Sequence, residues 1–249
     1  MIFVTGDVHC PIDIHKLTTK AWPAQRQLTK QDYLIVCGDF GIVWDNSNTD
    51  KYWQKWFDNK PFTTLFVDGN HSNHHLLNEF ETVNLFGGKA HKINNSVYHL
   101  MRREIFIIED KKFLALGGAP SHDKELRTPG LDWWPEEVPN NKECLNAINN
   151  LQRNNNEVDY IITHDIPTYV GLLRNRWFEP NAFTNFLSDE ILNAVKFKKW
   201  FAGHYHIDDD LCFHKMEGNN KVIPMGLMIE YGDYISEFHI LYDRVLELN

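Results

Sequence analysis

Five short apolar segments each run directly into side chains that can bind a metal ion, and this repeated pattern most constrains the fold. The segments read IFVT, YLIVC, TTLFVD, YIIT and KWFA. Segments this short and apolar are typical of strands buried on both faces of a sheet. In the first third of the chain they alternate with helical stretches, which favours parallel strands joined by crossover helices. The alternation predicts a mixed α/β domain.

Further strands and helices are predicted around these segments. We expect helices over residues 12–27, 50–59, 72–80, 142–154 and 188–196. Close-spaced strands are expected at 89–93, 96–101, 105–110 and 112–118, with a hairpin turn at 109–112 and a β-rich C-terminal region. Residues 117–140 are polar and rich in Gly and Pro, yet they carry two Trp. This composition favours an ordered functional loop over a disordered one.

Composition limits the class of protein. The 249 residues are 43% hydrophobic and 24% charged, which suits a single globular domain over residues 1–249. A net charge of −9 disfavours an extended nucleic-acid surface, and the apolar runs are far shorter than the ~20 residues that span a bilayer. The four cysteines show no Cys-x-x-Cys spacing. We therefore expect free thiols, no signal peptide ahead of the first strand and a cytoplasmic location.

The polar residues that follow the five segments form a constellation. They are Gly6-Asp7-Val8-His9, Gly38-Asp39, Gly69-Asn70-His71, His164 and Gly203-His204-Tyr205-His206. Because ligands of open α/β sheets bind beyond the carboxyl ends of strands, strands that end together would gather these groups. Glycine permits unusual backbone angles and a close backbone approach to an ion or phosphate. Residues i and i+2 of an extended segment face the same side, so Asp7 and His9 could reach one metal ion. His204 and His206 repeat this spacing.

Taken in order, these motifs resemble those of a known family. The set Asp-x-His, Gly-Asp, Gly-Asn-His, a strand-terminal His and Gly-His-x-His resembles the calcineurin-like metallophosphoesterase superfamily over residues 7–206. The stretches CGDFGIVWD, FTTLFVDGNH, LGGAPSHDKELR and WFAGHYH resemble, more narrowly, single-domain metallophosphoesterases common in phages and low-GC bacteria. The resemblance implies a four-layer α/β/β/α sandwich with two mixed β-sheets. It also implies hydrolysis of a phosphoester at a centre with two divalent metal ions.

The resemblance assigns a role to each matching residue. It implies that Asp7, His9 and His206 hold the first metal, that Asn70, His164 and His204 hold the second, and that Asp39 bridges both. A carboxylate can span two cations through its two oxygens, and a hydroxide bridging the metals would attack phosphorus. His71, adjacent to a ligand, is the natural general acid for the leaving alkoxide. The mixture of imidazole, carboxylate and amide ligands favours Mn or Fe, with Zn, Ni or Mg as alternatives.

The chain departs from the pattern of the superfamily's protein phosphatases. Those enzymes carry GDxxDRG and GNHExR, whereas this chain reads GDFGIVWD and GNHSNH and lacks the arginines that grip the phosphoryl group. Ser72 stands where an acidic residue usually follows GNH, and Cys10 stands where the first motif usually has Gly. These departures favour a phosphodiester or a nucleotide over a phosphoprotein.

Other residues must then bind the substrate. The substrate-binding candidates are Asp123, Arg127, Trp134 and Arg174. An arginine beside tryptophan suits a phosphate that carries a base, although exposed arginines beside packed tryptophans are also common. Two alternative functions stay open. One is a phosphomonoesterase or protein phosphatase, and the other is a catalytically weak, metal-containing protein that binds a nucleotide.

Overall fold

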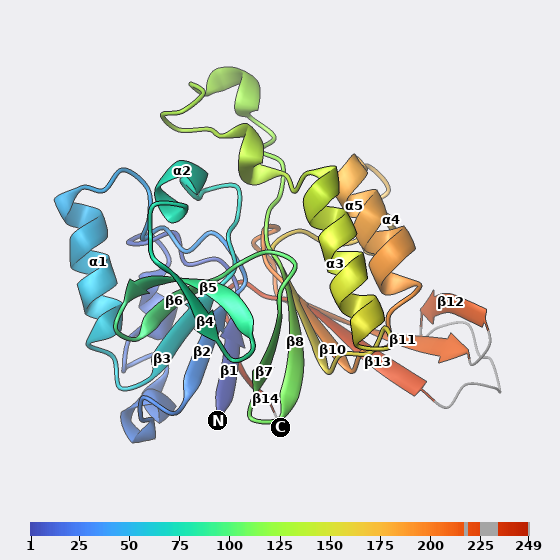
Figure 1. Ribbon diagram of the computed structural model, residues 1–249, viewed down its shortest axis with the longest axis horizontal. Coiled ribbons are helices and arrows are strands. Elements are labelled where there is room, and N and C mark those ends of the chain that lie inside the picture. The colour runs from blue at the N-terminus through green and yellow to red at the C-terminus, as the bar shows by residue number, and fades with distance from the viewer. Residues whose placement is uncertain (217–218, 225–233, 249) are drawn as a thin grey trace.

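Two β-sheets packed face to face form the centre of the computed structural model, which describes residues 1–216, 219–224 and 234–248 (Figure 1). Within these residues the first sheet has the strand order β14 (Val245–Leu248), β1 (Ile2–Thr5), β2 (Tyr33–Val36), β3 (Thr63–Phe66), β6 (Val97–Leu100), β5 (Gly88–Asn94), β4 (Thr82–Leu85). The second, in the same described ranges, has the order β12 (Asn219–Pro224), β11 (Asp209–Met216), β13 (Tyr234–Ile240), β10 (Lys199–Ala202), β9 (Tyr160–Thr163), β8 (Lys111–Leu116), β7 (Ile105–Ile108). Both sheets are mixed, as predicted, with parallel pairs at their centres.

Helices cover the outer face of each sheet (Figure 1). The first sheet packs against α1 (Asn48–Asp58), whose Phe57 lies in a cluster with apolar side chains of β2 and β3. The second sheet is covered by α3 (Asn141–Arg153), α4 (Thr168–Arg174) and α5 (Ala182–Phe186). A π-helical segment, Leu187–Leu192, continues α5. The described part of the chain therefore has the four α/β/β/α layers that the resemblance implies.

The central strands are apolar because both of their faces are buried. In β1, Val4 points into the layer between the sheets and packs in one cluster with Phe113 and Ile162 of the second sheet. Its neighbour Phe3 points outward and contacts Trp22, with ring centroids 5.0 Å apart. Alternation that places apolar residues on both faces produces the continuous apolar runs read in the sequence.

Three predicted helices differ from the structure. Residues 12–27 form two 3₁₀ turns, Ile14–Leu17 and Pro23–Gln27, instead of one helix. Thr18 separates them: its hydroxyl donates to the carbonyl of His15 and accepts from the amide of Ala21, so its side chain competes with helical bonding. The helix predicted at 72–80 is only α2 (His74–Leu77), after which the chain enters the unpredicted strand β4. The helix predicted at 188–196 starts earlier, in α5, and its π-helical part ends at Leu192.

Several other expectations are confirmed. α1 and α3 lie within two residues of the predicted ranges, and Glu109 and Asp110 form the predicted turn between β7 and β8 with left-handed φ angles of 49° and 61°. Residues 117–140 are ordered, and they rise above the strand ends at the top of Figure 1. No helix among the described residues is long and apolar enough to cross a membrane.

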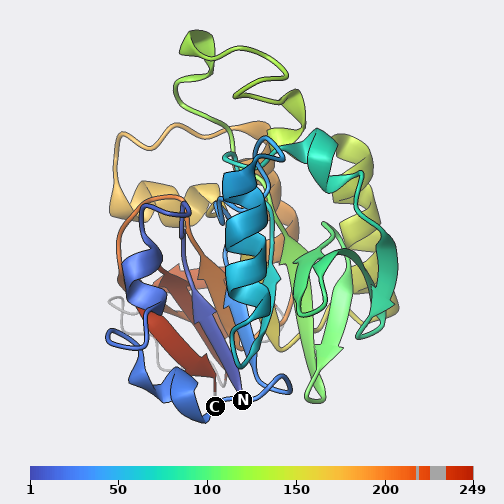
Figure 2. The ribbon, with the colours of Figure 1, turned by 90° about the vertical axis from the view of Figure 1, so that its left-hand side faces the viewer.

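The arrangement of the sheets places five loops together. β1, β2 and β3 of the first sheet and β9 and β10 of the second end at the same edge of the sandwich. The loop of residues 117–140 lies above this edge in both ribbon views (Figures 1 and 2). The polar residues that follow these five strands are thereby brought into one region.

Candidate metal centre

The seven predicted ligands meet at this edge in two neighbouring groups. We call Asp7, His9 and His206 the first cluster, and Asp39, His164 and His204 the second cluster; within each, one possible ligand atom per residue lies within 4.8 Å of the others. The amide oxygen Oδ1 of Asn70 lies 3.1 Å from His164 Nε2 and so adjoins the second cluster. Loops far apart in sequence thus supply each group.

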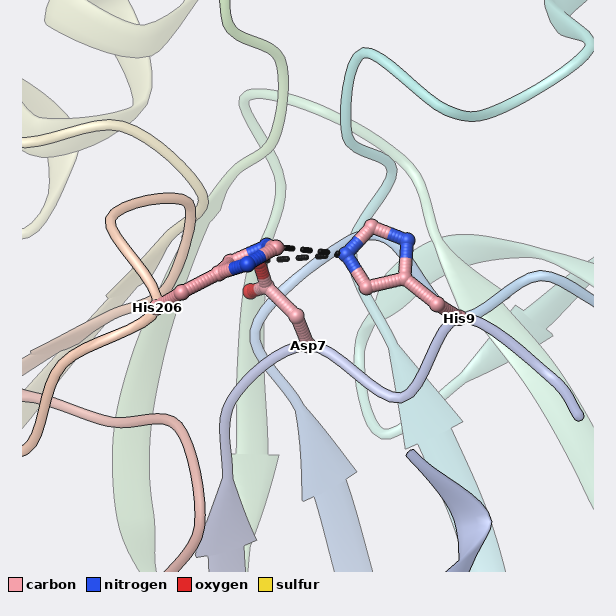
Figure 3. Close-up of side chains that lie close together, drawn as sticks. All are labelled: Asp7, His9 and His206. Carbon is pink, nitrogen blue, oxygen red and sulfur yellow. Dashed lines mark hydrogen bonds and ion pairs between the residues drawn. The ribbon is translucent and has the colours of Figure 1, made fainter. Parts of the chain in front are cut away.

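In the first cluster, two imidazoles face one carboxylate (Figure 3). His206 Nε2 lies 3.1 Å from Asp7 Oδ2 and 3.0 Å from His9 Nε2, and His9 Nε2 lies 3.6 Å from the same carboxylate oxygen. The ring of Tyr242 stacks on His206 at 4.7 Å between centroids. Asp7 is fully buried and its carboxylate also accepts the backbone N–H of His204. These contacts fix the orientation of the Asp7 and His206 side chains.

In the second cluster, His164 is held by its backbone surroundings. Its Nδ1 lies 2.8 Å from the carbonyl oxygen of Cys37, which can only accept, so Nδ1 carries the donated proton. This leaves Nε2 to face Asp39 Oδ2 at 3.2 Å and Asn70 Oδ1 at 3.1 Å. A carbonyl partner on one ring nitrogen commonly orients a metal-binding histidine.

Asp39 lies between the two clusters. Its Oδ1 accepts the backbone N–H of His71 at 2.8 Å. Its Oδ2 lies 3.2 Å from His164 Nε2 in the second cluster and 3.8 Å from His9 Nε2 in the first. A single oxygen therefore faces both clusters, in contrast to a carboxylate that spans two cations through its two oxygens.

The backbone at the site is not extended, so the two-residue spacing of the motifs does not by itself decide which way their side chains face. Four of the seven residues have left-handed φ angles: His9 at 40°, Asp39 at 43°, His204 at 70° and His206 at 50°. Such angles are uncommon outside glycine and concentrate at functional sites. The two-residue spacing therefore does not bring His204 and His206 to one position, and they lie apart as the resemblance implies. His204 joins the second cluster and His206 the first.

Two of the motif glycines make room for ligands of neighbouring loops. A Cβ atom added at Gly69 would collide with the carboxylate of Asp39, and one added at Gly203 would collide with the carboxylate of Asp7. From the sequence, we expect these glycines to let the backbone approach an ion or phosphate. In the structure they allow two loops to approach each other.

The electrostatics of the site suit bound cations. Burial opposes ionisation of Asp39, but the charge of His164 and its hydrogen bond lower the pKa of this carboxyl to about 2. Burial disfavours the charged form of His164, yet Asp39 and Asp7 raise the pKa of the imidazole to about 10. Burial, with a contribution from His164, lowers the pKa of His204 to about 4. Two buried carboxylates surrounded by imidazoles and an amide oxygen form a donor set that fits divalent transition-metal ions.

His71 and Arg127 lie beside the clusters. The ring of His71 lies 5.2 Å from that of His9 between centroids, and its Nε2 is 3.4 Å from Nη2 of Arg127. Burial lowers the pKa of His71; Asp39 opposes this effect and Arg127 adds to it. Asp123 pairs with Arg127 Nε at 2.7 Å, and the carbonyl of Asp132 accepts from Nη1 at 3.2 Å. The loop of residues 117–140 thus directs one arginine at the site.

The other candidates lie elsewhere. Trp134 is 1% exposed and packs edge-to-face against Trp44 at 5.2 Å, so it supports the loop instead of facing solvent. Arg174, at the C-terminal end of α4, has its Nε 2.7 Å from Asp209 Oδ2. Ser72 Oγ accepts the backbone N–H of Gly69 at 3.1 Å, which closes the turn that carries Asn70.

Sequence reasoning missed several residues that support the ligands. The buried ammonium of Lys16 donates to the carbonyl oxygens of Asp7 and Tyr242. Ser121 Oγ accepts from Asn70 Nδ2 at 3.3 Å. No local pattern marks either residue, because a lysine in a short 3₁₀ turn and a serine in a polar loop are typical of exposed segments.

A cavity of ≈ 350 Å³ opens beside His9 and His71. Its wall includes the aromatic ring of Trp44 and the acidic residues Asp45 and Asp50. Among the described residues that line it, none is lysine or arginine. The cavity therefore offers aromatic, hydroxyl and acidic surface next to the imidazole of His71.

The chain matches a known protein family over most of its length. A family model described as calcineurin-like phosphoesterase matches residues 1–208. No curated protein matches the chain. The matched range includes all five ligand-bearing loops and the loop of residues 117–140.

Proposed function

The chain belongs to the calcineurin-like phosphoesterase family, and from this premise we propose that it hydrolyses a phosphodiester or a nucleotide with the help of two divalent metal ions. The observation that carries the proposal is the convergence of the two clusters on Asp39, whose Oδ2 faces His164 at 3.2 Å and His9 at 3.8 Å. A shared carboxylate between two sets of donors is the arrangement that a two-metal hydrolase needs.

In this proposal the chain would hold the metals with the ligands found in the two clusters. Asp7, His9 and His206 would bind one ion, and Asn70, His164 and His204 the other, with Oδ2 of Asp39 between them. The donor set suits Mn or Fe best, with Zn, Ni or Mg as alternatives. When bound, the two ions would supply positive charge for the phosphoryl oxygens and would acidify a water molecule.

His71 would protonate the leaving oxygen. Its backbone N–H is anchored to Asp39 at 2.8 Å, which keeps the imidazole at the border of the clusters. Burial and the charge of Arg127 lower the pKa of His71, but a bound phosphate anion would offset the charge of Arg127. The anion would therefore favour the protonated imidazole at the moment when the leaving group needs a proton.

Arg127 would hold the substrate phosphate. Its guanidinium is oriented by Asp123 at 2.7 Å and by the carbonyl of Asp132 at 3.2 Å, and it reaches within 3.4 Å of His71. An arginine fixed on one side can donate its remaining N–H groups to a phosphoryl oxygen. The loop of residues 117–140 would thus replace the arginines that the phosphatase motifs provide in relatives.

The cavity beside His71 supports a leaving group without a second phosphate. The exposed acidic residue Asp45 in its wall disfavours an anion, and the indole of Trp44 offers a surface on which a base or another ring can stack. An alcohol or nucleoside leaving group fits this chemistry better than a phosphoanhydride does. The substrate class that we favour is therefore a phosphodiester or a nucleoside monophosphate.

Turnover of two p-nitrophenyl substrates by the Mn-loaded protein tests the proposal. We expect bis-(p-nitrophenyl) phosphate to be hydrolysed at a rate comparable to or faster than p-nitrophenyl phosphate. Hydrolysis of the monoester alone would contradict the preference for a diester and would favour the alternative of a phosphomonoesterase or protein phosphatase.

One observation favours the alternative of a catalytically weak nucleotide-binding protein. Ser72, at the position where relatives carry an acid, bonds to the backbone of Gly69 instead of supporting His71. If this alternative holds, the metal-loaded protein binds nucleotides without turnover, and His71→Ala changes neither property. A loss of turnover in His71→Ala would exclude it.

A further inference from the structure

Asn70 differs from the other candidate ligands because its side chain has two ends of nearly the same shape. Only the amide oxygen can bind a cation; the nitrogen carries two protons, and a half-turn of the amide exchanges the two atoms. In the structure Oδ1 lies 3.1 Å from His164 Nε2, toward the second cluster, and Nδ2 lies 3.3 Å from Ser121 Oγ. Whatever fixes this orientation decides whether Asn70 can be a ligand.

The partner of the Asn70 amide nitrogen is itself held by Glu137. Glu137 Oε1 accepts the backbone N–H of Ser121 at 2.7 Å, and Glu137 Oε2 lies 2.7 Å from Ser121 Oγ. A hydroxyl has one proton to donate, and a carboxylate has none. The proton of Ser121 therefore points to Glu137, and Ser121 offers only a lone pair to Asn70. A lone pair accepts from Nδ2 but cannot bond to Oδ1.

Burial makes this arrangement difficult to replace. Asn70 is 5% exposed, Ser121 4% and Glu137 1%. A flipped amide would place its oxygen against the lone pair of Ser121, and a buried polar atom without a hydrogen-bond partner is unfavourable. Glu137 is anchored through its carbonyl, which accepts from the backbone of Ala119 and from Arg102 Nη2, both at 3.1 Å.

We infer that Glu137 and Ser121 are positioning residues that hold the Asn70 amide with its oxygen toward the second metal position. The inference rests on the proposed function, because it assumes that the second cluster binds a cation. It assigns a specific task to the loop of residues 117–140: a hydrogen-bond relay from Glu137 through Ser121 sets the polarity of a ligand carried by a loop of the other sheet.

The variant Glu137→Gln tests the relay by reversing its polarity at constant shape. Glutamine can still accept the backbone N–H of Ser121, but its amide nitrogen then donates to Ser121 Oγ. The hydroxyl proton becomes free to point at Asn70 and bonds to Oδ1, which favours the flipped amide. Titration calorimetry with Mn²⁺ should show affinity for the second ion reduced by about 10–100-fold, with affinity for the first ion unchanged.

Matched variants separate the relay from a general loss of structure. Glu136→Gln changes the neighbouring, half-exposed glutamate and should leave both Mn²⁺ affinities unchanged. Ser121→Thr keeps the hydroxyl and should bind both ions, whereas Ser121→Ala should weaken the second. Because Ser121→Ala already breaks the relay, adding Glu137→Gln to it should cause no further loss.

The outcomes distinguish this inference from the proposed function. If the wild-type protein binds fewer than two Mn²⁺ ions, the two-metal proposal fails. If the wild type binds two ions and Glu137→Gln binds them with equal affinity, the relay is wrong and the proposed function stands. The relay is also wrong if Glu137→Gln lowers the affinity for the second Mn²⁺ ion by the same factor in the wild type and in Ser121→Ala. Should Glu137→Gln not fold, equal second-ion affinity in Ser121→Ala and Ser121→Thr would overturn it.

Discussion

At the scale of single residues, the two oxygens of Asp39 have separate tasks. Oδ1 holds the backbone of His71, and Oδ2 faces both clusters. The substitution Asp39→Asn keeps the shape of the side chain. If the amide oxygen keeps the bond to His71, a protonated nitrogen is left between the two metal positions.

We therefore expect Asp39→Asn to lose both metal ions, with a loss in affinity larger than the ~10–100-fold that outer-shell substitutions cost. Elemental analysis of the purified protein measures the metal content directly. Asp189→Asn, at an exposed position on the π-helical segment, is the matched control and should keep both ions. Loss of a single ion from Asp39→Asn would contradict the shared position of this carboxylate.

His71 offers a second test at this scale. In His71→Asn the ligands are unchanged, so both metal ions should be retained, and turnover should fall by about 10²–10⁴-fold. The loss should be largest for substrates with poor leaving groups, since p-nitrophenolate needs little protonation. His75→Asn, an exposed histidine on the next helix, should behave as the wild type. An equal loss for all leaving groups would argue against general-acid catalysis.

At the scale of secondary-structure elements, a buried ion pair joins neighbouring strand ends. Asp68 follows β3, and its carboxylate lies 2.6 Å from Arg102 Nη2 beyond β6 and 3.1 Å from His99 Nε2. Arg102 also reaches the carbonyl of Glu137 at 3.1 Å and the carboxylate of Glu143 in α3 at 3.4 Å. The guanidinium of Arg102 therefore links the first sheet to the loop of residues 117–140 and to α3, which covers the second sheet.

Arg102→Met should lower the free energy of unfolding by about 3–5 kcal/mol, because it leaves the Asp68 carboxylate buried without its cation. Urea denaturation monitored by tryptophan fluorescence measures this change. The double variant Asp68→Asn/Arg102→Met removes the uncompensated charge and should recover part of the loss. If the double variant is as unstable as the sum of the two single ones, the pair is not coupled as the distances indicate.

At the scale of the whole molecule, stability should depend on pH through buried histidines away from the clusters. Burial lowers the pKa of His74 to about 4, and burial together with the neighbouring His99 lowers the pKa of His91 to about 4. Unfolded histidine titrates near 6.5. Between these values the unfolded chain binds more protons, so acid favours unfolding.

As the pH falls from 6.5 toward 4, we expect these two histidines to lower the free energy of unfolding, by roughly 3 kcal/mol each. Urea titrations of the metal-free protein across this range measure the slope of the free energy of unfolding against pH. His91→Leu should make the slope shallower, whereas His15→Asn, at an exposed position, should not. A slope in His91→Leu equal to that of the wild type would contradict the assignment.

The sequence by itself determined the apolar strands, the composition of each ligand loop and the α/β character of the fold. These properties are local: a strand buried on both faces must be apolar, and the residues after it lie at its carboxyl end whatever surrounds them. The resemblance to a known family added the two-sheet architecture, which the structure confirms, and a division of the candidate ligands, whose side chains lie in two groups of the same membership. Helix limits such as those at 12–27 do not follow from the sequence pattern, because the hydroxyl of Thr18 bonds to the backbone of His15 and Ala21 and competes with helical bonding.

How the loops meet depends on the tertiary structure. The structure explains how His204 and His206 reach different clusters, because left-handed backbone angles turn neighbouring side chains in directions that an extended segment would not. The tertiary structure also brings Ser121 to Asn70 across 51 positions of chain, Glu137 to Ser121 across 16, and Arg102 to Asp68 across 34. Contacts of this range depend on which strands become neighbours, and that choice is made by burial of the whole core rather than by any local pattern.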